Sequence, residues 1–156
     1  MKGKRLVKVV EADGREFEES IFLPQIRSVI GFLKGTLDLN PYADCFPSKC
    51  KLGDIDGTVE VFGHTLVVEF KVDRATLNKG QVIKAVRQAK YGNVTTFFVF
   101  RETNRPKEYL RFSPNCIEGT GFVSTDVSKL KASFRTWSHW ARKNTLLPEE
   151  IASKYC

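Results

Sequence analysis

Residues 53–72 alternate between apolar and polar side chains on either side of a glycine, and this pattern constrains the fold most. A two-residue turn at Gly63-His64 has glycine first, as a type II′ turn prefers, and folds the stretch into a β-hairpin. Side chains along each strand then point alternately to the two faces of the hairpin. One face is apolar and collects Ile55, Val59, Val61, Leu66, Val68, Phe70 and Val72. We therefore expect this face to lie against a core.

The opposite face of the hairpin is polar, and its members suggest a chemistry. It collects Asp56, Thr58, Glu60, Glu69 and Lys71. In this register Asp56 lies opposite Lys71 and diagonal to Glu69, so the two acidic Cβ atoms should be roughly 7–8 Å apart. Magnesium is held in this way, by one or two carboxylates together with waters and phosphate oxygens of the substrate. The face therefore predicts metal-assisted hydrolysis of a phosphodiester, with Lys71 orienting a water or neutralising charge on a phosphate.

The alternative for the same residues is a solvent-exposed strand. Such strands often carry Glu and Lys, and an Asp56–Lys71 surface ion pair would stabilise the protein by almost nothing. The polar face alone does not decide between a catalytic site and an ordinary surface.

The segment 53–100 resembles the PD-(D/E)XK nuclease superfamily. In that family an aspartate begins one strand, a Glu-x-Lys ends the next, and a helix and a further strand follow. The resemblance implies that Asp56 and Glu69 bind the metal with the backbone carbonyl of Phe70, and that Lys71 is the catalytic lysine. No proline precedes Asp56, where the family name would place one. This leaves a choice between Asp54 and Asp56, which point the same way. Asp56 is preferred for its register with Lys71, and Asp54 is expected to assist as a metal ligand.

The resemblance also implies a fold class and a source. The expected fold is α/β, a single-domain restriction-endonuclease-like mixed sheet flanked by helices and spanning residues 1–156. That length suits one domain with a substantial core. The spacing of the two acidic residues is similar to that of archaeal Holliday-junction resolvases. The Asp-Ile-Asp-Gly motif and the Lys79-Gly80-Gln81 start of the helix look more like those of small nuclease-like proteins carried by phages.

Periodicity predicts the other elements. Short strands are expected at 6–10 and 16–17 around an Asp13-Gly14 turn, followed by a helix over 24–34 and an irregular segment over 37–51. A helix over 80–91 should bury Val82, Ile83, Val86 and Ala89. Strands are expected at 94–100, where both faces should be buried, and at 108–112. A last helix over 125–143, with Ser124 or Thr125 as N-cap, should bury Val127, Leu130, Phe134, Trp137 and Ala141.

The formal net charge of +7 favours a polyanionic partner. On the helix over 80–91, Gln81 is placed to contact a phosphate or the water network of the site. The expected nucleic-acid contacts are Lys49, Lys51, Lys84, Arg87 and Gln88. The last helix is also basic, and its cations are expected to bind phosphates without reading sequence. The alternative for each residue is a solvated surface, whereas Trp140 is expected to pack on a neighbouring element.

Features that the sequence lacks bear on where the protein is expected to be found and on whether its cysteines bind zinc. No signal peptide and no stretch of membrane-spanning length are present, so a cytoplasmic protein is expected, in the host bacterial cytoplasm if a phage encodes it. Cys45 and Cys50 lack two further ligands at tight spacing, so ordinary thiols are expected rather than a zinc site.

These observations together predict a Mg²⁺-dependent nuclease, with Mn²⁺ able to substitute, that hydrolyses phosphodiester bonds of DNA. An endonuclease is expected, and a homodimer would supply the two sites needed to cut both strands. The alternative is a catalytically silent protein of the same fold that acts as a nucleic-acid-binding or protein-interaction module.

Overall fold

The computed structural model describes residues 4–22, 40–45, 55–102, 105–152 and 154. Its elements fall into two compact units, Met1–Gly53 and Asp54–Cys156, and each is described by itself. The expectation of a single domain over 1–156 stays a prediction. The helix expected over 24–34, together with Lys49, Lys51 and Asp54, lies outside the described residues.

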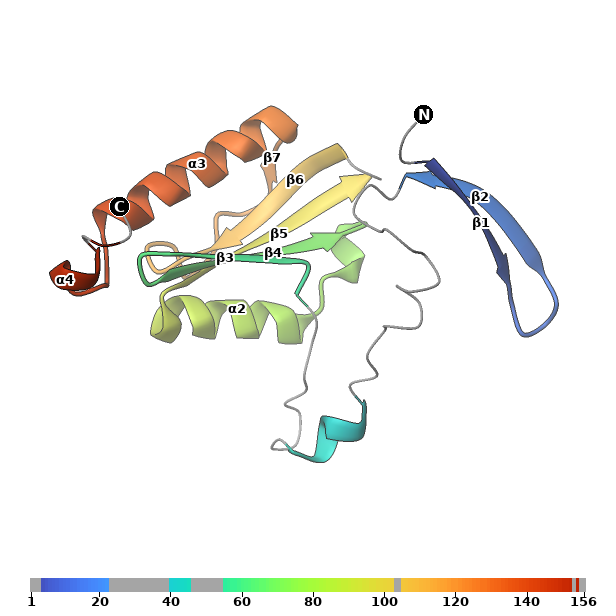
Figure 1. Ribbon diagram of the computed structural model, residues 1–156, viewed down its shortest axis with the longest axis horizontal. Coiled ribbons are helices and arrows are strands. Elements are labelled where there is room, and N and C mark those ends of the chain that lie inside the picture. The colour runs from blue at the N-terminus through green and yellow to red at the C-terminus, as the bar shows by residue number, and fades with distance from the viewer. Residues whose placement is uncertain (1–3, 23–39, 46–54, 103–104, 153, 155–156) are drawn as a thin grey trace. The chain divides into compact units, whose positions relative to one another are not determined.

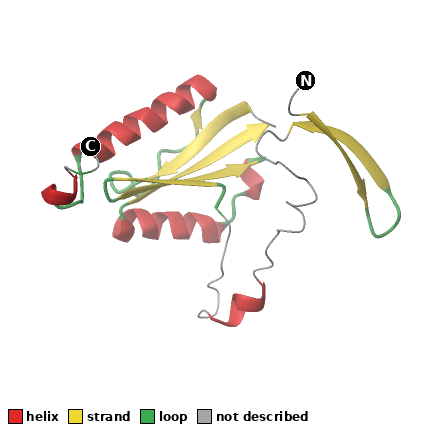
Figure 2. Cartoon of the chain, viewed as in Figure 1, coloured by secondary structure: helices red, strands yellow, loops and turns green. Residues whose placement is uncertain are grey.

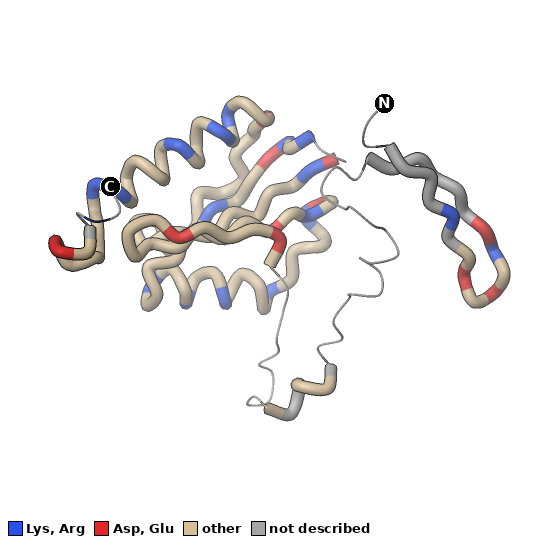
Figure 3. The backbone as a smooth tube through the Cα atoms, viewed as in Figure 1, with Lys and Arg blue, Asp and Glu red and all other residues tan. Residues whose placement is uncertain are grey.

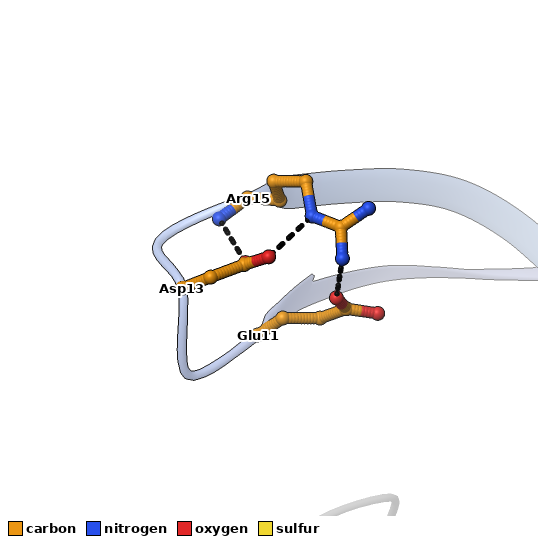
Figure 4. A network of polar contacts seen from close by, with 3 residues as sticks. All are labelled: Glu11, Asp13 and Arg15. Carbon is orange, nitrogen blue, oxygen red and sulfur yellow. Dashed lines mark hydrogen bonds and ion pairs between the residues drawn. The ribbon is translucent and has the colours of Figure 1, made fainter.

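The first unit contains an antiparallel hairpin of β1 (Lys4–Val10) and β2 (Glu16–Phe22) and a short 3-10 helix, η1 (Asn40–Cys45). The hairpin confirms the two strands expected around the Asp13-Gly14 turn, although the second strand is longer than predicted. Figure 4 shows the polar contacts of this turn: the Arg15 backbone N–H and Nε donate to Asp13, and its Nη2 donates to Glu11. The two carboxylates therefore hold Arg15 against the residues that precede it in the turn.

The second unit is built on a five-stranded mixed sheet in the order β3-β4-β5-β6-β7. Its strands are β3 (Gly57–Val61), β4 (His64–Lys71), β5 (Val94–Glu102), β6 (Arg105–Phe112) and β7 (Val123–Ser124). β4 and β5 are parallel and the other neighbours are antiparallel. Parallel neighbours need a crossover connection, and α2 (Lys79–Gly92) supplies it. The α/β class with a mixed sheet flanked by helices is confirmed.

The two long helices cover opposite faces of this sheet (Figures 1 and 2). On one face Phe98 and Phe100 pack with Ala85 and Ala89 of α2. On the other face Phe97, Val99, Leu66 and Val68 pack with the apolar stripe of α3 (Val127–Lys143), whose buried members are Leu130, Trp137 and Ala141. Because helices cover both faces, β5 is buried from Thr95 to Phe100, as the sequence predicted.

The ends of the helices depart in detail from the sequence expectations. α3 is capped by Asp126, whose Oδ1 accepts from the Lys129 N–H at 2.8 Å, so the Ser124 or Thr125 cap was wrong. A carboxylate satisfies an orphan N–H of the first turn and also favours the positive end of the helix dipole. Two helix residues expected to be buried are exposed, Ile83 at 41% and Val127 at 48%. Each lies toward the edge of its stripe, where the sheet does not reach.

The register of the β3–β4 hairpin differs from the predicted one by two residues. Val61 pairs with His64, so the turn residues are Phe62 and Gly63, with φ of 52° and 89°. Positive φ at both positions is a type I′ turn, which the right-handed strand twist favours. Phe62 adopts this conformation at a cost of about 1–2 kcal/mol. His64, the first residue of β4, is buried beside Trp140, and its Nε2 lies 2.6 Å from the Asn144 carbonyl oxygen.

The two-residue error in the predicted register does not change which side chains share a face of the hairpin. A slip of one residue would exchange the faces of a strand, whereas a slip of two returns every side chain to its own face. Leu66 and Val68 therefore lie in the core as predicted, with Val61 packed against them, and Glu69 and Lys71 lie on the opposite face. The expectation was wrong for the other members of the apolar face, which are exposed: Ile55, Val59, Phe70 and Val72. Trp140 packs against the His64 ring with 4.7 Å between centroids, which confirms its expected packing.

Candidate active site

Asp56 lies in a bend just before β3 and reaches across to the end of β4. Its Oδ2 accepts a hydrogen bond from the Phe70 backbone N–H at 2.7 Å. The β3–β4 ladder ends at the Gly57–Val68 pair, so this carboxylate takes the place of the next ladder bond. The predicted partner opposite Asp56 was Lys71. With the register shifted by two residues, the pairing extends to Glu69 opposite Asp56, and the Asp56 side chain accepts its hydrogen bond from the next residue, Phe70.

Glu69 and Lys71 project from β4 on the face of the sheet that α2 covers. They lie beside Phe98 and Phe100 of β5, which pack on α2. Lys71 Nζ lies 3.5 Å from Glu69 Oε2, and only 15% and 14% of the two side chains are exposed. Salt screens a pair with so little exposure much less than a surface pair. The structure therefore brings Asp56, Glu69 and Lys71 to the carboxyl end of one strand.

Gln81 takes part in capping α2, a role that the sequence analysis missed. The Gln81 N–H donates to Asn78 Oδ1 at 2.9 Å, and Gln81 Oε1 accepts from the Asn78 N–H at 3.3 Å. This reciprocal pair is a capping box. The signal was present as an Asn followed three residues later by a Gln. The amide group of Gln81 is thus held at the start of α2 through its oxygen.

Asp56, Glu69 and the Phe70 carbonyl form an all-oxygen donor set, which is the kind that Mg²⁺ prefers. The Phe70 N–H donates to Asp56, and because the N–H and C=O of a strand residue point to the same edge, the Phe70 C=O is expected on that side as well. Within the described ranges, no three His, Cys, Asp or Glu side chains cluster closely enough to hold a metal ion. Two carboxylates with waters are sufficient for Mg²⁺, so the donor set fits the ion.

α2 carries the other predicted contacts that the structure describes. Lys84 and Arg87 are exposed, and Gln88 is half-buried. Tyr91, four residues after Arg87, is also exposed. Figure 3 shows basic positions along α2, and its sequence contains no Asp or Glu. The helix therefore presents a cationic outer surface on the side of the sheet that also carries Glu69 and Lys71.

A cleft at the carboxyl ends of β4 and β5 was not predicted. Its volume is about 490 Å³, and its lining includes Arg74, Arg101, Glu102, Lys107 and Glu108. Arg74 donates two hydrogen bonds of 2.6 Å to Glu108, and these lower the pKa of the Glu108 carboxyl and raise the pKa of Arg74. With Asp73, the lining has as many acids as bases, so its local charge cancels. A sequence signal existed, since ligands of α/β sheets bind at the carboxyl ends of parallel strands.

Comparisons with known proteins add no relative. A scan against models of protein families, a search of curated proteins and a search of solved structures each found no match to this chain. No helix in the described part of the chain is long and apolar enough to span a membrane. The restriction-endonuclease-like resemblance accordingly stays a prediction.

Proposed function

We propose that the protein is a metal-dependent nuclease that hydrolyses phosphodiester bonds of DNA, and that it acts as an endonuclease. The hydrogen bond from the Phe70 N–H to Asp56 carries this proposal, because it holds a second carboxylate beside Glu69 and Lys71. The order of elements supports a restriction-endonuclease-like fold: a strand after Asp56, a strand ending in Glu-x-Lys, a helix, and a strand parallel to the second. A cytoplasmic location, a phage source and a homodimer belong to the same proposal.

The chemistry assigns a role to each residue of the site. Asp56, Glu69 and the Phe70 carbonyl would hold Mg²⁺ or Mn²⁺, with Asp54 assisting. A bound ion would supply Lewis-acid polarisation of the scissile phosphate and a lowered pKa for a coordinated water. The Lys71 ammonium, held near Glu69, orients that water or neutralises the charge that develops on the phosphate.

Binding of the DNA backbone is assigned to the outer surface of α2. Lys84 and Arg87 are exposed there, and Gln88 lies beside them. Contacts of this kind neutralise phosphates and fix the register of the duplex without reading its bases. Lys49 and Lys51 would contribute further phosphate contacts.

A catalytically silent module with the same fold is the second candidate, and one observation favours it. Each polar group of the site already has a partner within the protein: Asp56 accepts from Phe70, Glu69 pairs with Lys71, and Gln81 caps α2. Partners of this kind explain the side chains without turnover. The protein would then bind nucleic acid or another protein through its surface.

Cleavage of circular DNA tests the proposal. Supercoiled plasmid and a single-stranded circle are incubated with the full chain in Mg²⁺, Mn²⁺ or EDTA. We expect metal-dependent cutting that falls at least about a hundredfold in Lys71→Ala and Glu69→Gln, the size typical of losing one charged group from such a site. Glu118→Gln is the control, because this exposed carboxylate lies outside the site. Cutting that survives in both site variants would refute the assignment, and no cutting of circular, linear or branched DNA would favour the silent module.

A further inference from the structure

The outer surface of α3 carries cations that the proposed site does not use. The helix contains no Asp or Glu between Val127 and Lys143. Its exposed basic residues are Lys129, Lys131, Arg135, Arg142 and Lys143. Lys129 lies 3.8 Å from the carboxylate of the cap residue Asp126, whereas Lys131, Arg135 and Arg142 form no ion pair with any residue that the structure describes. Part of this surface is therefore cationic without local compensation.

Three of these residues form a line along the helix, which we call the α3 stripe: Lys131, Arg135 and Arg142. At 100° per residue their directions fall within about 40° of one another, on the side away from buried Leu130 and Trp137. At 1.5 Å per residue the stripe is about 16 Å long. A duplex carries one negative charge per roughly 1.7 Å of its axis, so several phosphates lie along such a length.

The position of the stripe separates it from the cations of α2. α2 and α3 pack on opposite faces of the sheet, so their outer surfaces face in opposite directions (Figures 1 and 3). Each helix alone is about 10 Å across, so the two outer surfaces are more than about 20 Å apart. That separation exceeds two Debye lengths at physiological salt, where one length is about 8 Å. The two surfaces therefore attract polyanions independently.

We propose that the α3 stripe is a second nucleic-acid-binding surface, so that one protomer binds two duplex segments at once. A single straight duplex that lies along α2 leaves the α3 stripe facing solvent on the other side of the sheet. A second segment would occupy it through phosphate contacts that read no sequence. Where the protein cleaves DNA, its preferred substrate would bring two segments together, as supercoiled or branched DNA does. This last step rests on the proposed function, whereas binding of two segments does not.

The stoichiometry of binding tests the proposal without any cleavage. The full chain is titrated with a short fluorescent duplex in EDTA at about 50 mM salt, where binding through counterion release is strong. We expect two duplexes per protomer for the wild type. A triple variant of the α3 stripe, K131Q/R135Q/R142Q, should bind one. Lys84→Gln with Arg87→Gln should also leave one, because the stripe remains.

A matched control removes the same charge from elsewhere. The variant K8Q/R15Q/K107Q also takes three positive charges from the net +7, but each of these cations already pairs with an acid. It should keep two duplexes per protomer. In a second assay, capture of a free duplex by a bead-bound duplex should fall at least tenfold with the α3 variant and stay unchanged with the control.

Several results would overturn the proposal. One is a single duplex per protomer in the wild type. A dimer in which each protomer used one surface would give this result, and it too would contradict the proposal. A second is an α3 variant that binds two duplexes, and a third is a control that loses as much as the α3 variant. The measurement uses EDTA, so a protein that fails to cleave DNA can still pass it, and the two proposals fail separately.

Discussion

Asp56 is expected to have two roles that different substitutions can separate. Its carboxylate holds the end of β4 through the Phe70 N–H, and in the proposed site it also binds the metal. Asp56→Ala removes both functions. Asp56→Asn keeps an oxygen that can accept from Phe70 but removes the charge, so it should lose metal binding and keep part of the hydrogen bond. The pair of variants therefore distinguishes a structural carboxylate from a metal ligand.

The expected sizes follow from the type of contact. A hydrogen bond to a charged group contributes about 1.5–3 kcal/mol, and a neutral one about 0.5–1.5 kcal/mol. Because Asp56 is exposed, the lower end of each of these two energy ranges applies. Asp56→Ala should then lower the free energy of unfolding by about 1.5 kcal/mol, and Asp56→Asn by about 1 kcal/mol or less. For a chain of this size, 1 kcal/mol corresponds to a change in Tm of about 2–4 °C.

Thermal unfolding followed by circular dichroism measures both effects. In EDTA the order of Tm should be wild type, then Asp56→Asn, then Asp56→Ala. A metal at about a hundred times its dissociation constant should stabilise the wild type by about 2.7 kcal/mol. Asp56→Asn should lose most of that gain. An equal gain in Asp56→Asn would refute the role as a ligand, and an unchanged Tm for Asp56→Ala in EDTA would refute the structural role.

Two further predictions concern the turn and the cleft of the second unit. Gly63→Ala, at φ +89°, would place a Cβ 2.7 Å from that of Leu146, whereas Gly121→Ala, at φ +69°, meets nothing within 4 Å. Both changes carry a backbone cost of about 1–2 kcal/mol, and only Gly63→Ala adds a steric clash. In urea denaturation Gly63→Ala should therefore lower the free energy of unfolding distinctly more than Gly121→Ala does. Equal decreases in the two variants would contradict this. Glu108→Gln should lower Tm at pH 7, because the folded-state pKa of Glu108 is depressed by hydrogen bonds from Arg74. The stability from that pair is present above the ordinary carboxyl pKa and is lost as pH falls through the lowered one, so a Tm difference that persists at pH 2 would refute it.

Local patterns predicted most of the second unit. The alternation in residues 55–72 assigned side chains to the correct faces of β3 and β4, because strand periodicity survives an error of two residues in register. α2, β5, β6 and α3 were all expected within a few residues of their bounds. The register itself was wrong. A glycine at position 63 suits either position of a two-residue turn, and the structure shows it in the second, after Phe62, with His64 buried beside Trp140 at the start of β4.

The candidate site also has one part that could be predicted from the sequence and one part that could not. Glu69 and Lys71 share a face because they are two residues apart on one strand, and the sequence is enough to show that. The Phe70 N–H as partner of Asp56, and the capping contacts of Gln81, depended on where β3 begins and how α2 starts. Neither is visible in periodicity alone.

The amino-acid sequence is enough to assign residues to a strand face or a helix stripe, because those relations follow from repeats of two and 3.6 residues along the chain. It also determined that both long helices are basic on their outer sides. The placement of α2 and α3 on opposite faces of the sheet is visible in the fold alone, since it depends on how the alternating side chains of β5 pack in two separate core clusters. The same charges would form one binding surface if the helices lay side by side, and they form two because a buried sheet lies between them.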